Sequence, residues 1–220
     1  YAPSGTPFAN GVWDYLTMLN ERDGGVNGVK LIVEECETQY DTKQGVECYE
    51  RLKGKNGGAT VFQPLSTGIT FALTDKVPAD KVPLITSGYG RSDTADGNMF
   101  KWNFPLIGHY WVAGDAVLQH IAKTQGGWDK LKGKKIGVVY HDSAFGKELL
   151  PIVQERSKMH GFELLLLPVP APGVDLAGFR LGPARVCGRR SEPALPHRLA
   201  GPDPGDRFGP FGAWIDLRVA

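Results

Sequence analysis

Hydrophobic positions along the chain change their period repeatedly between its start and residue 169. Short β-prone, apolar runs predict strands at residues 29–35, 59–62, 82–86, 99–104, 135–140 and 162–169. Apolar residues with helical spacing predict helices at residues 8–22, 41–56, 69–76, 110–125 and 144–160. Strands that alternate with helices in this way predict parallel βαβ units, so the expected fold class is α/β.

Two of the predicted helices begin with a recognisable cap. Asp41 is followed three residues later by Gln44, which is the spacing of a capping box. Ser66 and Thr67 precede the apolar residues of the next helix. Hydroxyls beside the free N–H groups of a helix start can bind a carboxylate or another anion. The alternative is that one of them only caps the helix.

Polar, glycine-containing loops follow three of the predicted strands, at residues 63–68, 87–90 and 141–146. Ligands of parallel sheets bind outside the carboxyl ends of the strands. These loops are therefore expected to line one ligand cleft.

Composition and motifs exclude several classes of function. The 25 Lys+Arg residues are balanced by 24 Asp+Glu residues and form no basic stripe, which argues against nucleic acid. No apolar run approaches the roughly 20 residues that span a bilayer. No dinucleotide fingerprint or Walker A motif is present, and His141-Asp142 lacks a nucleophile in a G-x-S-x-G elbow. We therefore expect no enzyme activity, no catalytic residue, no cofactor and no metal site.

The three cysteines leave two alternatives. Cys36 and Cys48 flank a predicted strand-to-helix turn, while Cys187 is far away in sequence. A disulfide between the first two would suit an oxidising compartment, and two buried free thiols are the other interpretation. Spacing alone does not decide between them.

The order of these motifs resembles the solute-binding proteins of branched-chain amino-acid ABC transporters, which have the type I periplasmic-binding fold. The resemblance covers about residues 1–175. It is carried by YAPSG at residues 1–5, NERDGGVNG at 20–28, DTKQGV at 41–46, the loops at 63–68 and 87–90, and IGVVYHDSAFGKEL at 136–149.

The resemblance implies two parallel-sheet lobes, joined by a hinge, that close on a small ligand. Residues 1–105 would form the first lobe, and residues 106–175 would begin an incomplete second lobe. Residues 104–108 would be the first hinge crossing. The implied partners are a small-molecule ligand and the permease subunits of an ABC transporter, and the implied compartment is the periplasm, after removal of a signal peptide.

The resemblance also implies roles for individual residues. Ser66 and Thr67 would bind the ligand carboxylate, and the loop after the next strand would bind the ammonium group or shape the pocket. Phe145 would face the ligand from the second lobe. The full set of implied ligand-binding residues is Ser4, Ser66, Thr67, Ser87, Gly88, Tyr89, Gly90 and Phe145. Tyr89 departs from the small residue common in aliphatic amino-acid binders, so aromatic carboxylates and amides stay open as ligands.

Two regions depart from the family pattern. The family's first strand, expected before YAPSG, is missing. Residues 177–220 contain no Lys, but they contain seven Arg, seven Gly and six Pro. We hypothesise that residues 176–220 are a frameshifted or misassembled C-terminus, with a genuine disordered tail as the alternative.

The sequence thus predicts an extracytoplasmic solute-binding protein for a branched-chain or hydrophobic amino acid, or a related small carboxylate. The alternative is a cytoplasmic amide or amino-acid sensor of the same fold.

Overall fold

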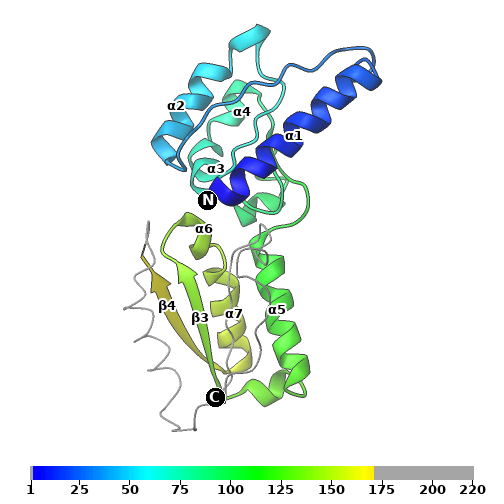
Figure 1. Cartoon of the computed structure of the whole chain (residues 1–220). Coiled ribbons are helices and arrows are strands. Elements are labelled where there is room, and N and C mark those ends of the chain that lie inside the picture. The colour runs from blue at the N-terminus through cyan, green and yellow to red at the C-terminus, as the bar shows by residue number, and fades with distance from the viewer. Residues whose placement is uncertain (1, 171–220) are drawn as a thin grey trace, which may run out of the picture. The chain divides into compact units, whose positions relative to one another are not determined.

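The computed structural model describes residues 2–170, with side chains from residue 5 onward (Figure 1). It divides into two compact units. Unit 1 comprises Tyr1–Thr86 and Asp96–Phe104, and unit 2 comprises Ser87–Ala95 and Pro105–Ala220. The predicted tail at residues 176–220, with Cys187, lies outside the described residues. The stretch Ser87–Ala95, which the sequence placed in a first lobe at residues 1–105, is grouped with unit 2.

Unit 1 is mainly helical. Its elements are α1 (Ala2–Arg22), α2 (Thr42–Leu52), η1 (Lys55–Gly57), α3 (Thr67–Leu73), α4 (Val77–Asp80), β1 (Leu84–Thr86) and β2 (Asn103–Pro105), whose last residue is counted in unit 2. β1 pairs with β2. The core consists of Tyr49, Ile69, Leu73, Val77, Val82 and Leu84. Gly45 brings α2 close to α3, since a Cβ there would overlap the Ile69 side chain.

The first helix starts earlier than expected. The sequence predicted a helix at residues 8–22, but α1 already begins at Ala2. Proline is tolerated in the first turn of a helix because the N–H it lacks has no partner there. Pro3 is therefore compatible with an early helix start.

The strand predicted at residues 29–35 is absent from the described structure. Val29 pairs with Val26 across a tight turn, and the side-chain amide of Asn20 exchanges two 2.8 Å hydrogen bonds with the backbone of Leu31. A strand requires a neighbouring strand, and no described strand lies beside this segment. The strand predicted at 59–62 is likewise reduced to one parallel bridge between Phe62 and Leu84.

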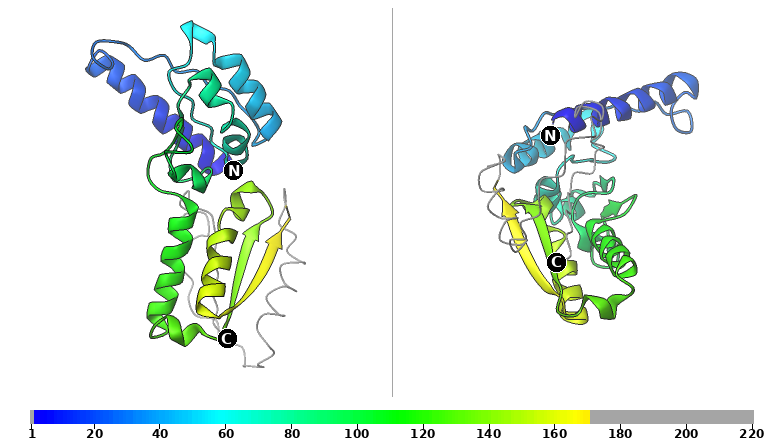
Figure 2. Two further views of the ribbon diagram at one scale, coloured as in Figure 1. Left: turned by 180° about the vertical axis from the view of Figure 1, so that it is seen from behind. Right: turned by 60° about the horizontal axis from the view of Figure 1, so that its bottom comes forward.

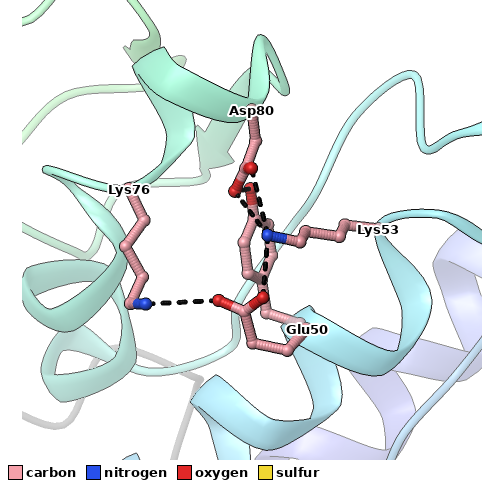
Figure 3. A network of polar contacts seen from close by, with 5 residues as sticks. Glu50, Lys53, Lys76 and Asp80 are labelled. Carbon is pink, nitrogen blue, oxygen red and sulfur yellow. Dashed lines mark hydrogen bonds and ion pairs between the residues drawn. The ribbon is translucent and has the colours of Figure 1, made fainter.

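Two connections secure α2. A disulfide joins Cys48 of α2 to Cys36, whose Cα atom lies 5.9 Å from that of Cys48. At the C-terminal end of the helix, Lys53 Nζ lies 3.0 Å from Asp80 of α4 and 2.7 Å from Glu50 (Figure 3). The Tyr49 hydroxyl also donates a 2.9 Å hydrogen bond to Asp80. Hydrogen bonds from Lys53 and then Tyr49 lower the pKa of Asp80.

Unit 2 is a layered α/β arrangement. Its elements are η2 (Ser92–Ala95), α5 (Tyr110–Thr124), η3 (Trp128–Leu131), β3 (Lys135–His141), α6 (Ala144–Lys147), α7 (Leu150–His160) and β4 (Glu163–Val169). β3 and β4 are parallel, with Lys135 opposite Glu163 and His141 opposite Val169. Both α5 and α7 lie on one side of this sheet (Figures 1 and 2). Between the helices and the sheet lie Leu118, Ile121, Val153, Ile136 and Val138.

The single helix predicted at residues 144–160 is two helices. α6 ends at Lys147, and α7 begins at Leu150 with Pro151 in its first turn. A proline ring clashes with the carbonyl four residues earlier, and that residue is Lys147. The break therefore follows from Pro151.

Candidate functional site

Ser66 directly precedes α3 and caps it. Its side-chain oxygen accepts a 3.3 Å hydrogen bond from the backbone N–H of Ile69, and its carbonyl accepts one of 2.8 Å from the Thr70 hydroxyl. Ser66 is 3% exposed and Thr67 is 1% exposed. The hydroxyl of Ser66 therefore caps α3 as an acceptor, and a hydroxyl that accepts one hydrogen bond can still donate another. Both residues belong to unit 1, as does Ser4, which lies in α1.

The loop Ser87-Gly88-Tyr89-Gly90 follows β1 and belongs to unit 2. Gly88 and Gly90 have φ values of 78° and 101°, a left-handed conformation that favours glycine. The chain bends at each of these two glycines, on either side of Tyr89. Burial raises the pKa of the Tyr89 phenol, and the nearby Tyr110 phenol raises it further.

Phe145 lies in α6 and packs against Tyr110 of α5. Their ring centroids are 5.6 Å apart and their planes meet at 67°, an edge-to-face arrangement. α6 itself sits tightly on the end of β3, because a Cβ at Gly146 would overlap backbone atoms of His141. Unit 2 thus brings together the aromatic side chains of Tyr89, Tyr110 and Phe145 at the carboxyl end of β3.

Sequence reasoning missed Glu148, which connects this region. Glu148 is 8% exposed, and its carboxylate accepts a 2.7 Å hydrogen bond from the backbone N–H of Ser92. Burial raises the pKa of Glu148, and the hydrogen bonds from Ser92 offset part of that rise. The bond fixes the start of η2, within the Ser87–Ala95 segment, to the short link between α6 and α7. The sequence signal for a buried Glu148 was its position directly before Leu149 and Leu150 in a predicted helix.

His141 and Ser143 are a base and a hydroxyl within hydrogen-bond distance of each other. A ring nitrogen of His141 lies 2.8 Å from the Ser143 oxygen. Ser143 occupies the cap position of α6, so the contact orients a helix start. Among residues 2–170, no group of three or more His, Cys, Asp and Glu side chains is placed to hold a metal ion.

Comparisons with known proteins identify the family. Residues 1–180 match the family model described as periplasmic binding protein. The chain belongs to the periplasmic binding protein family. Comparison with curated proteins gave no match.

Solved structures show which fold this periplasmic binding protein has. A crystal structure from the Pseudomonas fluorescens group, described as an ABC transporter permease, is 42% identical and has a TM-score of 0.62, over 76% of this chain and 41% of that one. A fatty acid ABC transporter substrate-binding protein from Thermomonospora curvata is 22% identical with a TM-score of 0.70, over 84% of this chain and 45% of that one. A branched-chain amino acid ABC transporter protein from Thermus thermophilus with bound valine is also 22% identical with a TM-score of 0.70, over 85% of this chain and 47% of that one.

These matches establish the type I periplasmic-binding fold that the sequence predicted. The chain spans less than half the length of each of these three structures. Within residues 2–170, no helix combines the length and the apolar character needed to cross a bilayer.

Proposed function

We propose that this chain is part of an extracytoplasmic solute-binding protein of an ABC transporter. It binds a branched-chain or other hydrophobic amino acid, or a related small carboxylate, and catalyses no reaction. The observation that carries the proposal is the family match over residues 1–180. The names of the similar structures from Thermomonospora curvata and Thermus thermophilus point to the same role.

What those two proteins share supports the proposed ligand class. One is named for fatty acids, and the other contains valine. Both ligands combine a carboxylate with an aliphatic body. A site for this chemistry needs hydrogen-bond donors for the carboxylate and apolar or aromatic walls for the body. Within unit 1, Thr67 and the start of α3 offer donors. Within unit 2, Tyr89, Tyr110 and Phe145 offer aromatic surfaces.

The individual roles in the proposal are as follows. Ser66 and Thr67 bind the ligand carboxylate, and Ser87 with the carbonyls beside Gly88 and Gly90 binds an ammonium group. The Tyr89 and Phe145 rings contact the ligand body. Ser4 approaches the ligand side chain.

The mechanism is ligand-stabilised closure of a hinged protein. Binding favours the closed state only to the extent that the ligand binds that state more tightly than the open one. The closed state is then the form that the permease subunits in the membrane recognise. This mechanism places the protein on the outer side of that membrane, in the periplasm.

Calorimetric titration with variants tests the proposal. Thr67→Val keeps the shape of a buried side chain but removes its hydroxyl, and Phe145→Ala removes an aromatic wall. Each should weaken binding of the best amino acid at least about tenfold, or 1.4 kcal/mol. Asp41→Ala is the matched control, since it removes the cap of α2, where Asp41 accepts a 2.8 Å hydrogen bond from Gln44 N–H. Equal affinity of Thr67→Val, Phe145→Ala and the control would contradict the assigned roles.

A further inference from the structure

The segment Ser87–Ala95 belongs to unit 2, but the chain on both sides of it belongs to unit 1. Thr86, which precedes the segment, and Asp96, which follows it, are both grouped with unit 1. Two glycines lie within its first four residues, and a third, Gly97, lies two residues beyond its end. Glycine backbone adopts a wider range of conformations than that of other residues. Ser87–Ala95 is therefore a part of unit 2 whose two ends are tied to unit 1 through conformationally free residues.

Within unit 2, a buried carboxylate holds this segment. Ser92 is 1% exposed, and its backbone N–H donates a 2.7 Å hydrogen bond to Glu148, which is 8% exposed. Glu148 lies in the link between α6 and α7, 56 residues away from Ser92 in the chain. Movement of the segment away from Glu148 would break this bond and let water reach the carboxylate.

The turn that carries Ser92 is braced by its own contacts. The hydroxyl of Thr94 donates a 2.6 Å hydrogen bond to the carbonyl of Arg91. The guanidinium of Arg91 donates two hydrogen bonds, of 2.7 and 2.9 Å, to the carboxylate of Asp93. These contacts lie within residues 91–94, so they stay intact when the segment leaves Glu148.

The surroundings of Glu148 favour its neutral, protonated form. Burial is the largest effect on the pKa of Glu148 and raises it, while the hydrogen bonds from the segment lower it. Of the charged groups that act on the carboxylate, Asp93 raises its pKa further and Arg91 lowers it. Arg91 already pairs with Asp93, and the neighbouring Lys147 already pairs with Asp142 at 2.6 Å. The buried carboxyl group therefore holds a proton more tightly than it would in water.

We propose that Glu148 is a positioning residue that takes up one proton when ligand binds, because the Ser87–Ala95 segment covers it in the closed state and leaves it in the open state. This inference rests on the proposed function, in which the loop Ser87–Gly90 contacts the ligand and closure accompanies binding. In the open state the carboxylate is in water, where a Glu side chain loses its proton above about pH 4.3. In the closed state the protonated carboxyl group still has an oxygen that accepts from the Ser92 N–H.

The linkage has a defined direction. The closed, ligand-bound state binds more protons than the open state, so a lower pH strengthens ligand binding. The gain in affinity is fully present below about pH 4.3 and is lost as the pH rises through the raised pKa of Glu148 in the closed state. Because one proton is taken up, the dissociation constant changes by at most about tenfold for each pH unit.

Calorimetric titration in two buffers tests the inference. The chain is titrated with L-valine and with L-phenylalanine at about pH 5.5, roughly one unit above the ordinary pKa of a Glu side chain. Acetate and MES release different heats when they lose a proton, so the difference in binding heat between them gives the number of protons taken up. The wild type should take up a fraction of a proton for each ligand bound, and its dissociation constant should decrease as the pH is lowered from about 7 to about 5.

Glu148→Gln should take up no proton, and its dissociation constant should not change with pH. Gln keeps an acceptor oxygen for the Ser92 N–H, so a purely structural role of Glu148 would not produce this loss of proton uptake. Glu155→Gln is the matched control, because Glu155 is an exposed carboxylate on α7 in the same unit. It should take up protons as the wild type does.

The outcomes separate this inference from the proposed function. Wild-type binding without proton uptake would overturn the inference and leave the proposed function intact, and this measurement needs no variant. Proton uptake that persists in Glu148→Gln would overturn it as well, since another group would then carry the proton. Absence of binding heat with both amino acids in both buffers would count against the proposed function itself, and the inference would fall with it.

Discussion

The backbone N–H of Ser92 donates a 2.7 Å hydrogen bond to the carboxylate of Glu148, 56 residues later in the chain. Both residues are almost fully buried, at 1% and 8% exposure. The bond ties the segment that follows the Ser87–Gly90 loop to the helical elements at the end of β3. The position of that loop, which carries four of the proposed ligand-binding residues, therefore depends on one buried carboxylate.

Glu148→Ala should destabilise the protein by about 1–3 kcal/mol, because it leaves the buried Ser92 N–H without its acceptor. Glu148→Gln keeps an acceptor oxygen at the same position and should cost much less at acidic pH. Urea unfolding followed by circular dichroism measures both. Similar losses from Ala and Gln at acidic pH would show that packing, not the hydrogen bond, explains the effect.

Glu148 should also make stability depend on pH. Burial raises its pKa in the folded protein, so the folded state keeps this proton at a pH where the unfolded state has lost it. The stability linked to this group is fully present below the unfolded pKa of about 4.3 and is lost as the pH rises through the folded pKa. The free energy of unfolding of Glu148→Gln, relative to wild type, should therefore increase with pH from about pH 4 upward. A difference that stays constant with pH would refute the linkage.

Gly146→Ala should cost about 1–3 kcal/mol, because the new Cβ would overlap backbone atoms of His141, which cannot rotate away as a side chain would. Gly11→Ala is the control. Gly11 also lies in a helix, but a Cβ there would meet nothing within 4 Å. That change should stabilise the protein by about 0.5–1 kcal/mol. Thermal unfolding that shifts in the same direction for both would contradict the tight contact between α6 and β3.

Reduction of the disulfide between Cys36 and Cys48 should lower the free energy of unfolding by about 3 kcal/mol, the value for closing a loop of this size. The measurement is urea unfolding with and without dithiothreitol, in a Cys187→Ser background so that this pair alone responds. Cys36→Ser/Cys48→Ser should have the lower stability and no response to the reductant. If the reductant leaves the stability of the cysteine-containing protein unchanged, the bond is not formed in solution.

Local signals in the sequence predicted local structure well. Asp41 and Ser66 each accept a hydrogen bond from the backbone N–H three residues later, as their positions before helical patterns indicated. The apolar runs at 135–140 and 162–169 form the paired strands β3 and β4. Capping depends on residues within one turn, and a buried strand is recognisable from its continuous apolar run.

Features that depend on distant partners were not predictable in the same way. Residues 29–35 have the composition of a strand, but a ladder requires a neighbour, and periodicity does not report one. The burial of Glu148 depends on Ser92, and nothing near either residue in the sequence indicates the other. Pro151 is different, because a proline inside the helix predicted at residues 144–160 by itself indicates a break before it.

Thermal unfolding across a panel of small ligands tests the central claim most directly. The panel contains aliphatic and aromatic amino acids, short fatty acids, aromatic acids and amides without a carboxylate. A ligand present at 100 times its dissociation constant adds about 2.7 kcal/mol to the free energy of unfolding, which raises the melting temperature by several degrees. We predict such a shift with at least one hydrophobic amino acid or small carboxylate, and a smaller shift in Thr67→Val. A cooperative transition that no carboxylate ligand moves would contradict the proposed function.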